Sequence, residues 1–214
     1  MRYSDAKEGC LAMDRSVDFW FDPSCPYTWI TSRWIVEAAT VRPLEIRWHV
    51  MSLSVLNEHR EVDPEGDPEG YLWGPVRVCV AVEQRHGPDG LARFFTAYGK
   101  RVHVGGEWAD FGDVLADAGL PADLAAAAET SEFDEAIRAS HAAGIALVGD
   151  HIGTPIIAAD DTDGNRVTFF GPVISRIPRG EEAGRLFDGA VLVAGVAGFH
   201  ELKGRPHAEP QFGG

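Results

Sequence analysis

Residues 19–34 read FWFDPSCPYTWITSRW, and this stretch decides the fold. Its first part is rich in aromatic and β-branched residues and ends at an Asp-Pro pair, which predicts a strand over residues 17–22. Over residues 26–40 apolar side chains recur at helical spacing, behind a proline that suits the first position of a helix because it has no N–H to lose. Cys25 therefore stands at a junction between a strand and a helix.

The rest of the chain alternates between strand and helix patterns in a definite order. The sequence predicts a second strand at 44–53, a polar loop at 57–74, four or five helices over 74–149, hairpin strands at 154–159 and 166–172, and a last helix at 179–203. A helical crossover lets the first two strands pair in parallel, and the hairpin adds antiparallel strands. This is the order of a thioredoxin-like α/β fold. We expect a flexible arm at 1–16, a thioredoxin-like domain made of 17–56 and 150–214, and an inserted all-helical domain at 57–149.

The composition is that of an ordinary globular protein with an acidic surface. Of the 214 residues, 45% are hydrophobic and 24% are charged, and the formal net charge is −14. Nucleic acids and anionic membranes need a basic surface, so neither is an expected partner. No apolar run is long enough for a transmembrane helix, and the first residues lack the apolar core of a signal peptide, so we expect a cytoplasmic protein. The histidines and cysteines show no zinc-ligand spacing, so no metal is expected.

Cys25 is the first candidate for chemistry. The thiolate is the reactive form of cysteine, and the unpaired N–H groups and dipole of a helix N-terminus stabilise it, so we expect the helix start to lower the pKa of Cys25. The alternative is that Cys25 is a small buried residue, as free cysteines often are. Cys10 and Cys79 have no close partner in the sequence, and for both we favour the structural interpretation.

Thr28 and two histidines are further candidates. Thr28 occupies the position of the second cysteine in a redox Cys-x-x-Cys site. A threonine cannot resolve a disulfide, but its hydroxyl can stabilise a thiolate or a mixed disulfide; the alternative is an ordinary helix residue. His49 and His103 are candidate proton donors, although a lone histidine is more often structural.

Pro155 directly follows Thr154 at the start of an apolar strand. In a thioredoxin-like fold a proline at this place is cis and faces the reactive cysteine, although only about 5–6% of X–Pro bonds in folded proteins are cis. A cis bond would let the backbone N–H and C=O of Thr154 pair with an extended substrate, as another strand would. The alternative is a trans proline that begins a strand.

Aromatic residues crowd the same region. Tyr27, which follows Pro26, is expected to be exposed and to shape a substrate groove, with Trp73 holding the apolar part of an acceptor. We assign Trp20 and Trp34 to the core instead, since large aromatic side chains contribute most to core packing.

The chain also contains DFWFDPSCPYTWITSRWI, HVMSLSVLNE, WGPVRV, GTPII, FFGPVISRIPRGEEAGRL and FHELK, which span it from about residue 17 onward. These stretches resemble the DsbA-like mycothiol-dependent nitroreductase family, cytoplasmic thioredoxin-fold proteins of bacteria that use mycothiol as their bulk thiol. Family members carry Cys-Pro-Trp-Cys where this chain has Cys25-Pro26-Tyr27-Thr28. The resemblance implies mycothiol as cofactor, Cys25 as nucleophile, Pro155 as the cis-proline and a homodimer, but no resolving cysteine.

Three functions stay open on these residues. The first, which we favour, is a monothiol oxidoreductase: Cys25 attacks a disulfide or another electrophile, nitro compounds included, and a small thiol such as mycothiol resolves the mixed disulfide. The second is a thiol transferase or isomerase, as in the similar kappa-class glutathione transferases and chromene-carboxylate isomerases. It would bind the cofactor thiol near Pro155 with Thr28 assisting and without turnover of Cys25. The third is a non-catalytic binding module.

Overall fold

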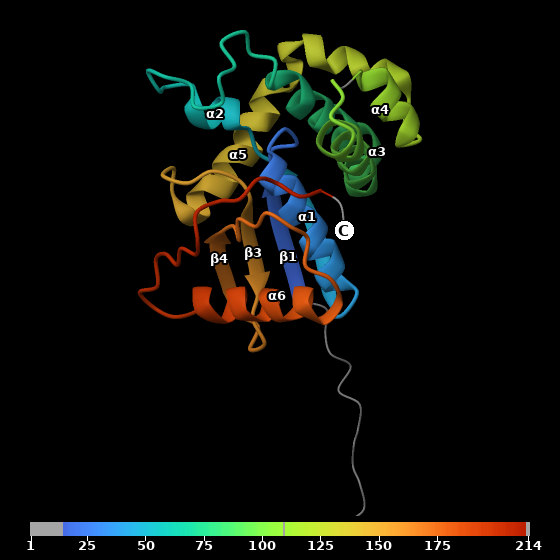
Figure 1. The fold of residues 1–214 in the computed structure, drawn as a ribbon. Helices are drawn as coiled ribbons and strands as arrows, with labels where there is room; N and C mark the ends of the chain where they lie inside the picture. The colour runs from blue at the N-terminus through green and yellow to red at the C-terminus, as the bar shows by residue number, and fades with distance from the viewer. Residues whose placement is uncertain (1–14, 109, 213–214) are drawn as a thin grey trace, which may run out of the picture.

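The computed structural model describes residues 15–108 and 110–212, with a mixed four-stranded sheet at its centre (Figure 1). The strands are β1 (Arg15–Phe21), β2 (Leu44–Val50), β3 (Ile156–Asp160) and β4 (Arg166–Phe170), in the spatial order β2-β1-β3-β4. Strands β1 and β2 pair in parallel, whereas β3 pairs antiparallel with both β1 and β4. The predicted parallel pair and the predicted hairpin are both confirmed.

Two helices lie against the same face of the sheet. Helix α1 (Pro26–Ala39) makes the crossover between β1 and β2. Helix α6 (Gly180–Ala194) runs across the strands of the sheet in Figure 1. The indole Nε1 of Trp34 donates to the carbonyl oxygen of Ala183 at 3.0 Å, which ties the two helices together. Trp34 is fully buried, as predicted, so this bond lies where water does not compete for it.

The segment between β2 and β3 is built from helices. They are α2 (Leu53–Asn57), α3 (Trp73–Gly99), a π-helical turn (Lys100–Val104), α4 (Phe111–Asp117), two 3₁₀ segments (Ala122–Glu129 and Ser131–Phe133) and α5 (Asp134–Val148). Helix α3 is interrupted at Gly87, whose φ of 70° is left-handed, and Pro88 restarts it. The short α2 was not predicted; the hydroxyl of Ser52 caps it by accepting from the N–H of Val55.

The helical segment shares a core with one face of the sheet. The rings of Phe21 in β1 and Phe95 in α3 are stacked with centroids 3.9 Å apart. On the opposite face Trp20 packs in a smaller cluster with Met51 against α5, as predicted for a core residue. Gly144 of α5 makes this approach possible, because a Cβ there would lie 2.9 Å from the Trp20 ring. The division into two domains stays a prediction.

The structure corrects several predicted boundaries. The second strand ends at Val50 and not at residue 53, because Leu53 begins α2. Residues 1–14 of the predicted arm lie outside the described residues, and Arg15 and Ser16 belong to β1. The last helix ends at Ala194 and not near residue 203, because Gly195 and Gly198 interrupt it and Gly198 has a φ of 82°. Residues 195–212 form a tail without regular structure, drawn red in Figure 1, which turns back across the sheet towards the start of α1. Within the described part of the chain, no helix is long and apolar enough to cross a membrane.

Candidate thiol site

Cys25 is the N-cap residue of α1, as the sequence predicts. Its backbone is extended, Pro26 occupies the first helical position, and the N–H of Trp29 donates to the carbonyl oxygen of Cys25 at 3.0 Å. The Cys25 side chain is half-buried. This position directs the sulfur at the first turn of the helix, where backbone N–H groups lack helical partners.

Three polar groups on the first turn of α1 act on the Cys25 thiol. They are the hydroxyl of Thr28 and the backbone N–H groups of Thr28 and Tyr27, and all three lower the pKa of the Cys25 thiol. Burial raises that pKa more strongly, and the charge of Asp22 adds to the increase, so the net pKa is above the ordinary value. The expectation of a lowered pKa is therefore wrong, because desolvation of the thiolate outweighs the helix start.

Thr28 meets the segment before β3. Thr28 is fully buried, and its Oγ1 donates to the Oγ1 of Thr154 at 3.2 Å. The same Thr154 oxygen accepts from the N–H of Asp22 at 3.3 Å and lies 3.5 Å from the carbonyl oxygen of Trp20. The Thr154–Pro155 peptide bond is cis. The fold thus joins two predicted site segments that are 126 residues apart in the chain.

A buried carboxyl group holds the Cys25 loop in place. One oxygen of Asp22 accepts from the N–H of Ser24 and the other from the N–H of Leu53, both at 2.8 Å. Asp22 is completely buried, and this burial raises its pKa to about 6 against the lowering effect of those two bonds. Because Leu53 is the first residue of α2, Asp22 connects the end of β1 to the helical segment.

Two side chains from the helical segment also hold the loop. The hydroxyl oxygens of Ser24 and Tyr98 lie 3.4 Å apart, and burial raises the pKa of Tyr98 to about 12. His103 Nε2 lies 2.8 Å from the carbonyl oxygen of Pro23, and burial lowers the His103 pKa. A neutral His103 that carries its proton on Nε2 therefore donates to this carbonyl, two residues before Cys25.

The other candidate proton donor, His49, lies elsewhere. Its Nε2 is 2.7 Å from a carboxylate oxygen of Asp18, and its ring stacks on Trp20 at 4.5 Å. These contacts give His49 a structural role on the opposite face of the sheet from α1.

Tyr27, which was expected to be exposed, is half-buried because the C-terminal tail packs on it, and it lies at the edge of a pocket of about 630 Å³. The pocket lies between the start of α1, residues 173–178, α6 and the C-terminal tail. The Tyr27 hydroxyl donates to the carbonyl oxygen of Ala208 at 3.2 Å, and the Tyr27 and His207 rings are 5.5 Å apart. A groove beside Tyr27 was expected, but the tail as one of its walls was not.

Trp73 begins α3, away from these contacts. Its ring lies beneath the guanidinium groups of Arg77 and Arg138, at 5.2 and 5.4 Å from the centroid. Among the described residues, its ring contacts do not include Tyr27. A role for Trp73 in holding an acceptor therefore stays a prediction without geometric support.

The remaining cysteines fit the structural interpretation as far as the structure describes them. Cys79 is fully buried in α3, and burial raises its pKa well above the ordinary value. Cys10 lies outside the described residues. The described part of the chain contains no group of three or more histidine, cysteine or acidic residues that could hold a metal ion.

Sequence reasoning missed Asp22 and the C-terminal tail. A signal for Asp22 exists, because it is an acidic residue directly after a buried apolar strand and three positions before the cysteine. The tail gives no such signal: the sequence predicts that residues 195–203 continue the last helix, and the glycines, proline residues and polar residues after them indicate a loop. Phe212, whose ring lies 5.9 Å from that of His103, could have suggested a docked end.

Known proteins are similar to this chain in sequence. The family model described as mycothiol-dependent nitroreductase Rv2466c matches residues 24–204. Rv2286c of Mycobacterium tuberculosis (strain ATCC 25618 / H37Rv), an uncharacterized protein, is 30% identical over 194 residues, which cover 88% of this chain and 81% of that one.

Two solved structures are similar in fold. They are the probable DsbA oxidoreductase SCO1869 from Streptomyces coelicolor (TM-score 0.53, 14% identity, 84% of this chain and 89% of that one) and the oxidoreductase DsbA from Xylella fastidiosa (TM-score 0.51, 16% identity, 86% and 88%). At these identities the likeness shows the thioredoxin-like fold. The family match, which covers most of the chain, establishes that the chain belongs to the Rv2466c-like family of mycothiol-dependent nitroreductases and is a thiol-dependent oxidoreductase.

Proposed function

We propose that the chain is a monothiol oxidoreductase in which Cys25 is the single nucleophile. The observation that carries this proposal is the place of Thr28, which stands on the first turn of α1, three residues after Cys25, and lowers the pKa of the Cys25 thiol through its hydroxyl. The other described cysteine, Cys79, is buried in α3. The chain thus has the setting of a two-cysteine site with a hydroxyl in place of the resolving thiol.

The first step forms one bond and breaks one. The Cys25 thiolate attacks one sulfur of a disulfide substrate, a mixed disulfide forms on Cys25, and the other sulfur leaves as a thiolate. The N–H groups of Thr28 and Tyr27 and the Thr28 hydroxyl stabilise negative charge on the Cys25 sulfur before this attack and again when it becomes the leaving group.

A small thiol supplies the second thiolate, which attacks the mixed disulfide and releases Cys25; the family match favours mycothiol for this role. The donors around Cys25 suit such a partner, because they face a sulfur that is still partly exposed. For a nitro substrate, oxidation of Cys25 and one small thiol to a mixed disulfide provides two electrons and two protons, which reduce a nitro group to a nitroso group and water. The dependence of the family on mycothiol also supports a cytoplasmic location.

The hydroxyl pair of Thr28 and Thr154 can follow the charge of Cys25. With Thr28 donating to Thr154, the Thr28 oxygen can accept the proton of a neutral Cys25 thiol. When Cys25 is ionised, Thr154 can donate to Thr28 instead, which frees the Thr28 proton for the sulfur. No atom has to move far, since the two oxygens are already 3.2 Å apart.

Thr154 also offers its backbone to a substrate. Its backbone N–H and C=O make no hydrogen bond to the residues that the structure describes, although the Thr154 side chain is buried. An extended substrate can therefore pair with Thr154 beside Pro155 while Tyr27 contacts its other end.

Mass spectrometry tests the proposal. After treatment with oxidised mycothiol or oxidised glutathione, we expect one thiol adduct per chain, located on Cys25 and removed by excess thiol. The matched control is Cys79→Ser, which should still form the adduct. An adduct that persists in Cys25→Ser, or a chain that forms none, would refute Cys25 as the exchanging thiol.

The raised pKa of Cys25 favours a second candidate, a thiol transferase or isomerase. A protonated Cys25 would then hold the thiol cofactor by hydrogen bonding and would not exchange. Tight binding of the reduced thiol without any adduct would support this function, whereas neither binding nor adduct would leave only a non-catalytic binding module.

A further inference from the structure

The pocket beside Tyr27 is lined by an unusual set of charges for so acidic a chain. Three arginines, Arg176, Arg185 and Arg205, line it together with His207 and one carboxylate, that of Glu182. The chain as a whole has 33 acidic residues against 19 lysines and arginines. A local excess of positive charge in such a protein indicates a site for negative charge.

Two of these arginines lack a carboxylate partner among the described residues. Most described arginines have one within ion-pair distance: Arg15, Arg42, Arg47, Arg77, Arg85, Arg101, Arg138, Arg166, Arg176 and Arg179. Arg185 and Arg205 make no such pair and no side-chain hydrogen bond to the described residues, although the charge of Arg185 lowers the pKa of Glu181 and Glu182. Their guanidinium groups are therefore available to a ligand.

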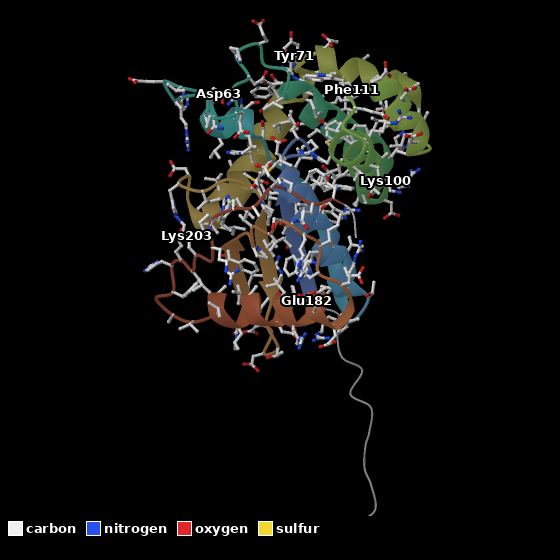
Figure 2. The ribbon with its side chains drawn as sticks, viewed as in Figure 1. Asp63, Tyr71, Lys100, Phe111, Glu182 and Lys203 are labelled. Carbon is white, nitrogen blue, oxygen red and sulfur yellow. The ribbon has the colours of Figure 1, made fainter. Side chains whose placement is uncertain are left out.

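The acidic groups on the first turn of α6, beside the pocket, are paired with arginines. Glu182, labelled on the first turn of α6 in Figure 2, accepts two hydrogen bonds from Arg176, at 2.5 and 3.0 Å. Glu181 accepts two from Arg42, at 2.7 and 3.0 Å. The α6 N-terminus is also occupied, because Glu37 accepts from the N–H of Gly180. Among the arginines that line the pocket, those without an ion pair to a described residue are thus Arg185 and Arg205.

The tail that carries Arg205 is anchored on both sides of the pocket. The Tyr27 hydroxyl donates to the carbonyl of Ala208, and the N–H of Gln211 donates to the carbonyl of Ser175 at 2.7 Å. These two bonds keep Arg205 and His207 next to Tyr27, which lies two residues after Cys25. Arg205 and His207 are therefore held in the wall of the pocket beside Tyr27.

We infer that the pocket lined by Tyr27, Arg185 and Arg205 binds an anionic group, a carboxylate or a phosphate, on the electrophilic substrate that reacts with Cys25. Guanidinium groups bind both of these oxyanions through paired hydrogen bonds. The tyrosine ring provides a face for an aromatic or apolar body between that anion and the reacting atom. This inference rests on the proposed function of Cys25 as a nucleophile.

Two aromatic disulfides, one anionic and one neutral, test whether the pocket binds an anionic group. Dithiobis(nitrobenzoate) carries a carboxylate on each ring, whereas dithiodipyridine is neutral. Each forms a mixed disulfide with Cys25 and releases one absorbing product, the coloured nitrothiobenzoate thiolate from the first and the ultraviolet-absorbing neutral thiopyridone from the second, which takes up the proton of the thiol. We expect the ratio of the two second-order rate constants, anionic over neutral, to fall about threefold in Arg185→Gln or Arg205→Gln and about tenfold in the double variant. The rate measured in Cys25→Ser is subtracted from each.

Arg60→Gln is the matched control, because it removes the same charge from an exposed arginine outside the pocket and should leave the ratio unchanged. An unchanged ratio in the double variant, with the neutral disulfide still reacting, overturns the anionic pocket but not the thiol chemistry. If Cys25 does not react with the neutral disulfide at all, the proposed function falls and the pocket inference with it.

Competition then identifies the anion. At constant ionic strength, benzoate should slow the reaction with dithiobis(nitrobenzoate) if the pocket takes carboxylates, and inorganic phosphate should do so if it takes phosphates. If neither anion slows the wild-type reaction, the pocket is not an anion site.

Discussion

The two described cysteines lie in opposite kinds of surroundings, and burial raises the pKa of both. Cys79 is fully buried in the middle of α3 and has no donor that lowers its pKa. Cys25 is half-buried at the first residue before α1, where one hydroxyl and two backbone N–H groups face its sulfur. In a helix interior the backbone N–H groups are already hydrogen-bonded to backbone carbonyl groups, whereas the first N–H groups of a helix have no such partner.

This difference shows where reactivity comes from in this fold. Desolvation acts on both thiols, so it cannot distinguish them. Partial exposure and unpaired donors occur only at Cys25, and the loop that holds them there is fixed by Asp22 and Thr154. We therefore expect substitutions in this loop to change chemistry, and substitutions around Cys79 to change stability.

The largest effect is expected for removal of the nucleophile. Cys25→Ser should lower the rate of disulfide exchange by about a thousandfold or more, because a serine oxygen cannot form the mixed disulfide. Cys79→Ser should leave that rate unchanged and lower the free energy of unfolding by about 1–3 kcal/mol, since its hydroxyl would be buried without a partner. Exchange assays and urea denaturation measure the exchange rate and the free energy of unfolding of both variants. A fall in the exchange rate of Cys79→Ser would contradict the assignment of chemistry to Cys25 alone.

The next effect concerns the pH dependence of stability. Burial raises the pKa of Asp22 from 3.8 to about 6, so the folded protein holds this proton more tightly than the unfolded chain does. The contribution is fully present below the unfolded pKa and is lost as the pH rises through the folded pKa. Relative to Asp22→Asn, the wild type should therefore lose about 3 kcal/mol of unfolding free energy between about pH 4 and pH 7.

Urea denaturation at a series of pH values measures this difference. Asn cannot accept from both the Ser24 and the Leu53 N–H groups, but that loss is the same at every pH. Asp117→Asn is a control of opposite sign, because a hydrogen bond from Arg101 lowers the pKa of Asp117, and stability from this pair is lost as the pH falls. Parallel curves for wild type and Asp22→Asn would show that Asp22 is not held neutral by burial.

The sequence predicts the parts of the site that are local and misses those that depend on distant segments. Cys25 and Thr28 are visible because a strand, a proline and a helix follow one another within a few residues. The contact between Thr28 and Thr154 follows only from the fold. The raised pKa of Cys25 and the pocket rim at Arg205 depend on how tightly later segments cover the loop, which no periodicity encodes.

A third effect tests how the helical segment supports α1. Gly99 ends α3, and a Cβ there would lie 2.1 Å from the Trp29 ring, which is 2% exposed and packed beside Phe95. Gly99→Ala should lower the free energy of unfolding by about 1–3 kcal/mol through overpacking. Gly189→Ala in α6 is the matched control, because nothing lies within 4 Å of its Cβ, and it should stabilise by up to about 1 kcal/mol. Equal stability of the two variants would show that Trp29 can move away.

The smallest effect isolates the hydroxyl that replaces a second thiol. Thr28→Val keeps the shape of a fully buried side chain but removes a donor from the Cys25 sulfur and a partner from Thr154. The pKa of Cys25 should rise further, and its alkylation by iodoacetamide at neutral pH should slow about fivefold, as expected for one hydrogen bond of about 1 kcal/mol.

Thr28→Ser restores the hydroxyl and should restore the rate. Alkylation rates are measured against pH for the wild type and both variants. The Thr28→Ser rate separates the effect of the hydroxyl from a loss of structure, because a misplaced loop would slow alkylation in Thr28→Ser as well. If Thr28→Val reacts as fast as the wild type, the hydroxyl does not act on the thiolate, and the donors of Cys25 are the backbone N–H groups alone.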